Sequence, residues 1–347
     1  MGSALFGIFD FTTQHIQKDQ EFFRQWLDQG LQGSMSYMDH PARQDPSLIL
    51  EEVQTALVFL FPYSGGHRTR RRKGQSAPVS SFPAHSLGEK KLVARYAHGP
   101  DYHKVLRAKL QEKAKKLEEQ IGYAYRPIVD SAPFLERAHG RAAGLGFVGK
   151  NTLLIRPGMG SFFFIATLLT TAPASLLAEK AAPRPALETL SCGSCQRCID
   201  ACPTQALDAR GYILDAHRCL SYWSIEHRGT VPEEFLPHFE KIWFGCDICQ
   251  EVCPYNWVTE EPSFSMVLPF FLNLAPVDIA FMTPQNYEKW FGGTAVTRAK
   301  FAGLVRNALY HLYAIRHPDY EKALDHCALS TFPLIVQTVQ QLRSMRL

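Results

Sequence analysis

The sequence predicts an α/β fold for the first half of the chain, followed by a cysteine-rich segment and a helical C-terminal region. Residues 56–61 and 162–169 are apolar runs of strand length. Residues 102–120 place apolar side chains at helical spacing among Lys and Glu, and residues 301–309 repeat that spacing near the C-terminus. The 347 residues, 46% of them hydrophobic, suffice for two or three domains.

Each expected strand of the first region has its own local pattern. Residues 56–61 contain no charged side chain, so they fit a strand that is buried on both faces. Residues 126–130 are a shorter strand candidate that ends on Asp130, and residues 152–155 and 162–169 are two further buried strands. We expect these strands to form the centre of the domain, with helices covering them.

The first region shows neither a secretory signal nor a convincing membrane span. Residues 1–10 contain no basic segment followed by a long apolar core. Residues 157–178 are free of charge and nearly long enough to cross a bilayer. Because Gly158, Gly160 and Pro173 interrupt this stretch, it is better interpreted as a buried strand with flanking turns.

A Pro- and Ala-rich stretch at residues 181–186 predicts a domain boundary. We therefore expect a first domain at residues 1–176, a cysteine-rich domain at 177–260 and a helical C-terminal region at 261–347.

Two cysteine runs, each ending in Cys-Pro, supply the thiolates for two 4Fe–4S clusters. In the two-cluster ferredoxin pattern, closely spaced cysteines wrap one cubane while the cysteine before proline reaches the other cluster. The second run is one cysteine short, and Cys219 can supply the missing ligand. The predicted ligand sets are Cys192, Cys195, Cys198 and Cys253 for one cluster, and Cys202, Cys219, Cys246 and Cys249 for the other.

Two alternatives to the clusters remain open at this point. Repeated Cys-x-x-Cys motifs also suit tetrahedral zinc, and eight cysteines would permit a disulfide framework in a secreted chain. Neither alternative explains the complete first run. We expect the ninth cysteine, Cys327, to be a buried free thiol of the helical region. Because cluster thiolates need reducing surroundings, we also expect a cytoplasmic protein without membrane association.

Three polar clusters in the first region are candidates for a reaction site. Asp130 ends a predicted strand, where α/β folds bind ligands, although it could simply cap the following helix. The glycines of residues 144–151 would let a cofactor approach the backbone closely, but they lack the dinucleotide-binding spacing and could form an ordinary turn. His98 and His103 precede or begin a predicted helix, and the simpler interpretation makes them surface or capping residues.

Together with the cysteine runs, these clusters closely resemble the epoxyqueuosine reductase family over nearly the whole chain. The matching segments are residues 35–38, 43–46, 101–104, 129–137, 144–151, 160–164, 219–222 and 290–291, with Arg298 and residues 306–307.

The resemblance implies a cobalamin-dependent reductase that converts epoxyqueuosine to queuosine at the wobble position of tRNA. It also implies a nitroreductase-like, cobalamin-binding first domain, a ferredoxin-like domain with two 4Fe–4S clusters, and Asp130 as the proton donor. The sequence lacks an Asp-x-His-x-x-Gly cobalt-ligating motif, so we expect the cobalt to remain open for redox chemistry. The expected cobalamin contacts are Arg43, Asp130, Lys150, Asn151, Ser161, Ser221 and Asp247.

Two other functions share part of this pattern. A corrinoid reductive dehalogenase would use the same cofactors, but such enzymes usually carry a twin-arginine signal, which this sequence does not show. A plain electron-carrier subunit would leave Asp130 and residues 149–151 without a role.

The tRNA partner has weaker support from the residues themselves. Residues 68–73 form a basic run that could bind phosphates or could be a solvated loop. Arg298, Lys300 and Arg306 are further candidates for RNA contacts. The net charge of only +4 adds no broad nucleic-acid signature. We expect a monomer that receives electrons from an external donor.

Overall fold

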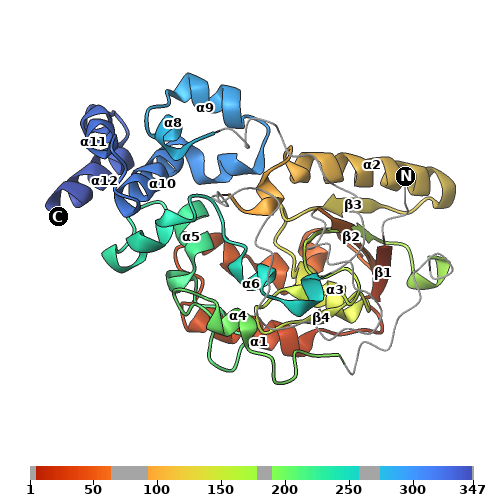
Figure 1. Ribbon diagram of the computed structural model, residues 1–347. Helices are drawn as coiled ribbons and strands as arrows, with labels where there is room; N and C mark the ends of the chain where they lie inside the picture. The colour runs from red at the N-terminus through yellow and green to blue at the C-terminus, as the bar shows by residue number, and fades with distance from the viewer. Residues whose placement is uncertain (1–4, 64–92, 178–189, 258–273, 346–347) are drawn as a thin grey trace, which may run out of the picture. The chain divides into compact units, whose positions relative to one another are not determined.

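The computed structural model describes residues 5–63, 93–177, 190–257 and 274–345, which fold into two compact units (Figure 1). The first unit comprises Met1–Gly66, Gly99–Cys219 and Ile248–Met266, and the second comprises His67–His98, Leu220–Asp247 and Val267–Leu347. The cysteine-rich segment contributes to both units. The division into three domains therefore stays a prediction. The basic run at residues 68–73 and the linker at 181–186 lie outside the described residues.

A four-stranded antiparallel sheet forms the centre of the first unit. Its strand order is β1 (Leu5–Asp10), β2 (Thr55–Pro62), β6 (Phe163–Thr170) and β3 (Tyr125–Ile128). The apolar runs predicted as strands at 56–61 and 162–169 are the two central strands, where both faces are covered. The edge strand β1 escaped prediction because its six residues show no clear alternation.

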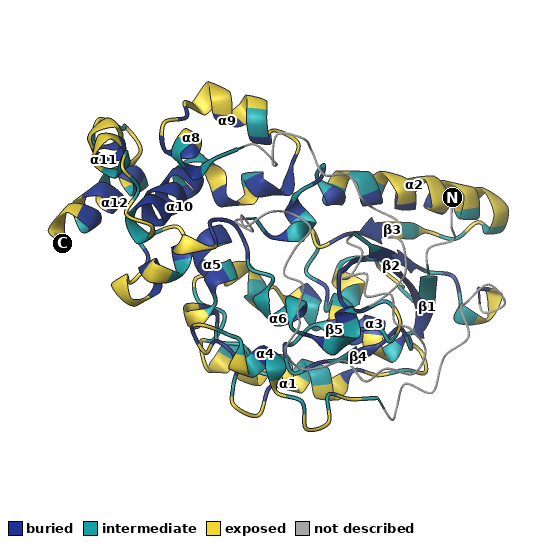
Figure 2. Ribbon diagram, viewed as in Figure 1, coloured by how far each residue is buried: buried dark blue, intermediate teal, exposed yellow. Residues whose placement is uncertain are grey.

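Helices cover both faces of this sheet. The central strands β2 and β6 are almost entirely buried, as Figure 2 shows for β2. On one face, Val58 packs in a hydrophobic cluster with Ala138 of α3 (Glu136–Ala142). On the other face, the Phe164 ring stacks on Tyr102 of α2 (Tyr102–Ile121), with 4.1 Å between ring centroids. The predicted helix at 102–120 is thus confirmed. Asp101 caps its N-terminus, because its side chain accepts a hydrogen bond from the His103 amide.

The expected strand at 152–155 is wrong in length and in place. Only β5 (Leu154–Ile155) is extended, and it pairs with β4 (Phe147–Val148) in a small hairpin outside the main sheet. Thr152 adopts a positive φ of 64°, so the chain turns where the strand was expected to begin.

The helices around the cysteines are short. They are α4 (Arg197–Asp200) and α6 (Ile248–Glu251), with the 3-10 turns η8 (Ala216–Arg218) and η10 (Pro254–Asn256). The N-terminal helix α1 (Gln17–Asp28) contacts this segment, since the indole N–H of Trp26 donates to the Leu214 carbonyl over 2.7 Å. The remaining turns of the first unit are η1 (Ser36–Asp39), η2 (Pro41–Arg43), η3 (Pro46–Leu48) and η5 (Ala174–Leu176).

The second unit is helical in its described part, as the sequence predicts. Its central helix α10 (Lys300–Ala314) is buried from Gly303 to Leu312, and the neighbouring elements pack around it. Those elements are α5 (Leu220–Ile225), η9 (Glu233–Glu240), α8 (Pro276–Ala280), η11 (Ala295–Ala299), α11 (Tyr320–Ala328) and α12 (Pro333–Ser344). Two further elements, η4 (Arg95–Ala97) and α9 (Pro284–Phe291), contact η11. Within the described ranges, no helix is both long enough and apolar enough to span a bilayer.

Arg306 of α10 corrects one expected RNA contact. Its side chain is fully buried and its guanidinium donates to the carbonyls of Trp223, His227 and Gly229. The neighbouring Asn307 extends this network, because its amide donates to the carbonyls of Ser224 and Trp243. Arg306 therefore stabilises the protein interior and is not available to RNA.

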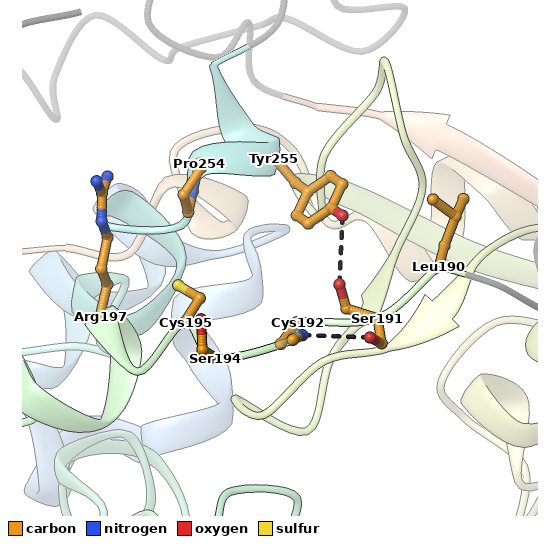
Figure 3. Close-up of a pocket in the computed structure, with 9 residues that line it drawn as sticks. Leu190, Ser191, Cys192, Ser194, Cys195, Arg197, Pro254 and Tyr255 are labelled. Carbon is orange, nitrogen blue, oxygen red and sulfur yellow. Dashed lines mark hydrogen bonds between the residues drawn. The ribbon is translucent and has the colours of Figure 1, made fainter.

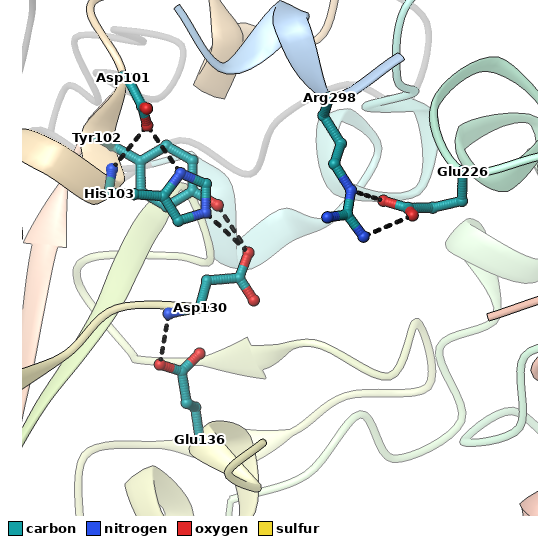
Figure 4. Close-up of polar contacts among 7 residues, drawn as sticks. All are labelled: Asp101, Tyr102, His103, Asp130, Glu136, Glu226 and Arg298. Carbon is teal, nitrogen blue, oxygen red and sulfur yellow. Dashed lines mark hydrogen bonds and ion pairs between the residues drawn. The ribbon is translucent and has the colours of Figure 1, made fainter. Parts of the chain in front are cut away.

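Arg298 keeps a half-exposed side chain, but its guanidinium makes two hydrogen bonds of 2.8 Å to the Glu226 carboxylate within the same unit (Figure 4). Lys300 is exposed. For both residues an RNA contact stays a prediction.

Candidate active site and cluster ligands

Asp130 follows β3 in a strained turn. Its backbone has φ of 48°, in the left-handed region that non-glycine residues adopt rarely and that Asp and Asn tolerate better than most. The amide N–H of Asp130 donates to Oε1 of Glu136, the first residue of α3, over 3.0 Å (Figure 4). Because the N-cap of α3 is Leu135, the alternative that Asp130 caps the helix is wrong.

The start of α2 supplies the polar partners of the Asp130 carboxylate. The hydroxyl of Tyr102 donates to Oδ2 of Asp130 over 2.7 Å, and Nε2 of His103 lies 3.7 Å from the same oxygen. On its other side, Nδ1 of His103 lies 2.8 Å from Oδ1 of Asp101. Figure 4 shows the Asp130 carboxylate directed toward this group.

His103 therefore belongs to the site and is more than the surface or capping residue of the simpler interpretation. Burial lowers the pKa of His103, but its hydrogen bonds to Asp130 and Asp101 outweigh burial and raise the pKa overall. His98 behaves differently, since it bonds the Val93 carbonyl in the second unit and burial lowers its pKa.

A second carboxyl, Glu136, lies beside Asp130. It is half-buried, and burial together with the nearby Asp130 carboxylate raises the pKa of Glu136 to about 8. Glu136 lies in one of the matching segments, yet sequence reasoning assigned it no role. No regular helix or strand joins Asp130 to Glu136, because residues 129–135 form bends and irregular chain, so only the folded turn brings the two together.

Arg43 lies within electrostatic reach of both carboxyls. Burial lowers its pKa, while Tyr37, Asp130 and Glu136 raise it. The guanidinium carbon lies 6.0 Å from the centroid of the Tyr37 ring, and Nη1 lies 3.5 Å from the Phe134 carbonyl oxygen. Its Nε is buried and finds no hydrogen-bond partner among the described residues. Arg43 therefore has a donor left for a ligand.

Lys150 and Asn151 already contact the cysteine loops. The Lys150 amide donates to Sγ of Cys192 over 3.3 Å, and its ammonium donates to the Gly193 carbonyl over 3.0 Å. The side chain of Asn151 is buried and donates to the Cys249 carbonyl over 3.3 Å. Both residues link the turn before β5 to the expected cluster ligands.

Ser161 makes a similar link at the start of β6. Its amide donates to Oδ1 of Asn256 over 2.6 Å, and the Gln250 amide donates to its carbonyl over 3.1 Å. Gly160 allows this approach, because an added Cβ would lie 2.1 Å from Oδ1 of Asn256. The second cysteine run is thereby fixed against the sheet.

The other two expected cobalamin contacts lie in the second unit. Oδ2 of Asp247 accepts a hydrogen bond from the Arg95 amide over 2.8 Å, and Ser221 lies in α5. The structure does not gather all seven expected contacts within one unit, so their common role stays a prediction.

The first expected ligand set lies within the first unit. Burial, together with the neighbouring Cys192, Cys253 and Cys195, raises the pKa of the Cys198 thiol to about 11. Thiolates that repel one another in this way would be neutralised by bound iron. Cys192 and Cys195 also line a pocket of about 660 Å³ (Figure 3), bounded by Leu190, Ser191, Gly193, Ser194, Arg197, Pro254 and Tyr255.

The second expected set is divided, with Cys202, Cys219 and Cys249 in the first unit and Cys246 in the second. This assignment stays a prediction.

Among the described residues, no three His, Cys, Asp or Glu side chains converge closely enough for a single metal ion. Cys327 is buried in α11, as expected.

Replacing Cys253 by Ala is expected to remove one cluster of the two, so that iron per chain falls to about half. Iron determination and visible absorbance of anaerobically purified protein measure this loss. Cys327→Ala is the matched control, because Cys327 lies outside both cysteine runs and should leave the iron content unchanged. A Cys253→Ala variant with full iron content would contradict the ligand assignment.

Known families match two parts of the chain. A model described as a 4Fe-4S double cluster binding domain matches residues 191–256, which confirms two iron–sulfur clusters. A model described as epoxyqueuosine reductase QueG, DUF1730, matches residues 43–131.

Curated relatives match most of the chain. The epoxyqueuosine reductase of Cyclobacterium marinum is 34% identical over 298 residues, covering 84% of this chain and 87% of that protein. The epoxyqueuosine reductase of Pseudomonas aeruginosa is 36% identical, covering 84% and 77%.

Solved structures share the fold. The epoxyqueuosine reductase from Streptococcus thermophilus superposes with a TM-score of 0.77 at 25% identity, covering 97% of this chain and 85% of that one. The enzyme from Bacillus subtilis, solved with the loop of its catalytic aspartate swung out of the active site, gives 0.74 at 25% identity, with coverage of 97% and 85%. An epoxyqueuosine reductase crystallised with an epoxyqueuosine-modified tRNA stem loop gives 0.76 at 23% identity, with coverage of 97% and 84%.

Proposed function

This chain belongs to the epoxyqueuosine reductase family, and we propose that it reduces epoxyqueuosine to queuosine in tRNA, using cobalamin and Asp130 as the proton donor. The observation that carries the assignment of Asp130 is its strained turn, which holds the carboxylate against Tyr102 and His103 at the end of a strand. The catalytic aspartate loop of the Bacillus subtilis enzyme supports an aspartate in this role.

The reaction explains why the chain carries two clusters. Removing the epoxide oxygen as water and leaving a double bond consumes two electrons and two protons, whereas each 4Fe–4S cluster passes one electron at a time. Cobalamin, when bound, supplies a low-potential centre that can collect both electrons. The protein must therefore supply the protons and the geometry.

The residues of the first unit fit a bound corrinoid in part. Arg43 has a buried donor without a partner and can bind a polar group of the cofactor. Asn151 and Ser161 are buried and already bonded within the protein, so they would act chiefly by fixing the nearby backbone. Lys150 keeps a partly exposed ammonium that can hold a second polar group.

Asp130 would deliver its proton from Oδ1. The Tyr102 hydroxyl donates to Oδ2, so the proton of a neutral Asp130 carboxyl belongs on the other oxygen. That side chain is 64% exposed, so burial by the protein does not keep Asp130 protonated. The bound cofactor and substrate would have to exclude water from the Asp130 side chain, which would raise the free energy of its charged form.

We also propose the anticodon stem-loop of tRNA as the macromolecular partner. The relative solved with an epoxyqueuosine-modified stem loop supports this substrate. Residues 68–73 and Arg298 are the proposed phosphate contacts. A cytoplasmic monomer that takes electrons from a separate carrier fits this role.

The decisive test is turnover of an anticodon stem-loop that carries epoxyqueuosine. We expect the anaerobic protein with cobalamin and a chemical reductant to yield a product that lacks one oxygen atom by mass spectrometry. Omitting cobalamin should abolish the product and remove the corrinoid bands from the absorption spectrum. A protein that holds both clusters but neither binds cobalamin nor reduces the stem-loop would instead be an electron carrier. Turnover of a halogenated substrate alone would indicate a dehalogenase.

A further inference from the structure

We propose that the Thr204 hydroxyl donates a hydrogen bond to the Cys202 thiolate and thereby raises the reduction potential of the second cluster. This inference rests on the expected ligand assignment, in which Cys202 binds that cluster, and it goes beyond the reduction of epoxyqueuosine. Thr204 acts through Cys202 and touches no reacting atom, so it is not a catalytic residue.

The loop from Cys202 to Ala206 folds back onto the Cys202 sulfur. The Ala206 amide donates to Sγ of Cys202 over 3.3 Å, and Oγ1 of Thr204 lies 3.7 Å from the same sulfur. In a free thiol either of these last two atoms could be the donor. A cysteine that binds iron has lost its proton, so in the cluster the Thr204 hydroxyl has to donate.

The backbone of this loop holds both donors in place. Gln205 adopts a positive φ of 52°, and its amide donates to the Cys202 carbonyl over 3.2 Å. This tight turn directs the Ala206 amide back to the sulfur. Thr204 itself is only 5% exposed, so little water competes for its hydroxyl and the hydrogen bond to sulfur gains strength from its surroundings.

Two further hydrogen bonds connect this loop to the turn that carries Cys219. Nε of Arg218 donates to the Thr204 carbonyl over 2.9 Å, and the Asp215 amide donates to the Ala206 carbonyl over 2.9 Å. The turn η8 ends at Arg218, directly before Cys219. The loop that surrounds the Cys202 sulfur is therefore fixed to a second expected ligand of the same cluster, which supports their common assignment.

Hydrogen bonds to the ligand sulfurs are one of the factors that set the potential of an iron–sulfur cluster. Reduction adds one electron, and the added negative charge spreads onto the cysteine sulfurs. A donor to such a sulfur therefore stabilises the reduced cluster more than the oxidised one. By this reasoning, Thr204 makes the second cluster accept an electron more readily.

Two substitutions at position 204 isolate the hydroxyl. Thr204→Val removes it and keeps the branched shape, whereas Thr204→Ser retains it. In anaerobically purified protein with both clusters, a redox titration followed by electron paramagnetic resonance should show one cluster of Thr204→Val at lower potential. We expect its reduction equilibrium to fall about tenfold, which is about 59 mV for a one-electron couple. The other cluster should be unchanged, and Thr204→Ser should titrate like the wild type.

Thr338→Val is the matched control for this titration. It removes a hydroxyl that is equally buried, but this hydroxyl donates to the Leu334 carbonyl within α12, outside both cysteine runs. Both potentials should therefore stay at their wild-type values.

The Cys253→Ala background identifies which cluster shifts. That substitution is expected to leave only the second cluster, so adding Thr204→Val should lower the potential of the cluster that remains. A shift that occurs in the wild-type background and disappears here would place Cys202 on the other cluster and overturn the assignment.

A second readout needs no change in potential. A hydroxyl proton exchanges into heavy water much faster than a hydrogen-bonded amide such as that of Ala206. Brief transfer of the wild type to heavy water should therefore shift an iron–thiolate stretching band in its resonance Raman spectrum. The shift should persist in Thr204→Ser and be smaller in Thr204→Val.

Each outcome decides one point. Unchanged potentials in Thr204→Val, or the same heavy-water shift in Thr204→Val as in the wild type, would overturn the role of Thr204. Equal potentials for Thr204→Val and Thr204→Ser, both lower than the wild type, would show that packing and not the hydroxyl sets the potential. Wild-type protein that gives the expected shifts but does not reduce epoxyqueuosine would overturn the proposed function and leave the role of Thr204 intact.

Discussion

Asp130→Asn is expected to keep both clusters and bound cobalamin while losing turnover of the epoxyqueuosine stem-loop by about 10²–10⁴-fold. Asn has nearly the same shape, tolerates the left-handed backbone and can still accept the Tyr102 hydroxyl on its amide oxygen. It lacks an acidic proton. The loss should therefore appear in kcat, measured by mass spectrometry of the stem-loop, and leave the visible spectrum unchanged.

Asp28→Asn provides the matched control, because Asp28 is an exposed residue at the end of α1 and takes no part in the site. It should retain wild-type turnover. If Asp130→Asn also turned over at the wild-type rate, another group would have to protonate the oxygen, and Asp130 would keep only a structural role.

Arg306→Ala is expected to destabilise the protein by roughly 3–5 kcal/mol, a large share of the roughly 5–15 kcal/mol that holds a typical domain folded. The substitution leaves the carbonyls of Trp223, His227 and Gly229 without their donors inside the second unit, and it also opens a cavity. Arg306→Lys should recover little, since a single ammonium cannot replace a forked guanidinium at three acceptors. The urea midpoint, followed by circular dichroism, measures the effect.

Arg298→Ala is the comparison for this experiment. Its ion pair with Glu226 is half-exposed, so its loss should cost only about 0–1 kcal/mol. Similar midpoints for the Arg306→Ala and Arg298→Ala variants would show that the buried network adds no more than a surface pair. The contrast also separates stability from RNA binding, because Arg298 remains a proposed phosphate contact and Arg306 does not.

Local patterns were sufficient for the larger part of the fold. The charge-free runs that became β2 and β6 could be recognised because a strand with both faces covered needs no polar positions. Helix α2 could be recognised because its buried and solvated faces recur at 3.6-residue spacing. The same reasoning misjudged Leu154 and Ile155, since a short apolar run does not reveal whether a sheet or a hairpin buries it.

The sequence by itself determined that this protein carries two iron–sulfur clusters, and it predicted a strand running to Asp130, whereas β3 ends at Ile128 and Asp130 lies in the turn that follows. Ligand spacing is a property of neighbouring residues, so the sequence records it directly. Tertiary structure alone decided that Glu136 and His103 flank Asp130 and that Arg306 is buried instead of exposed to RNA. These facts depend on contacts between residues that lie apart in sequence, and the pKa of Glu136 arises only where folding removes water and brings a second carboxyl near.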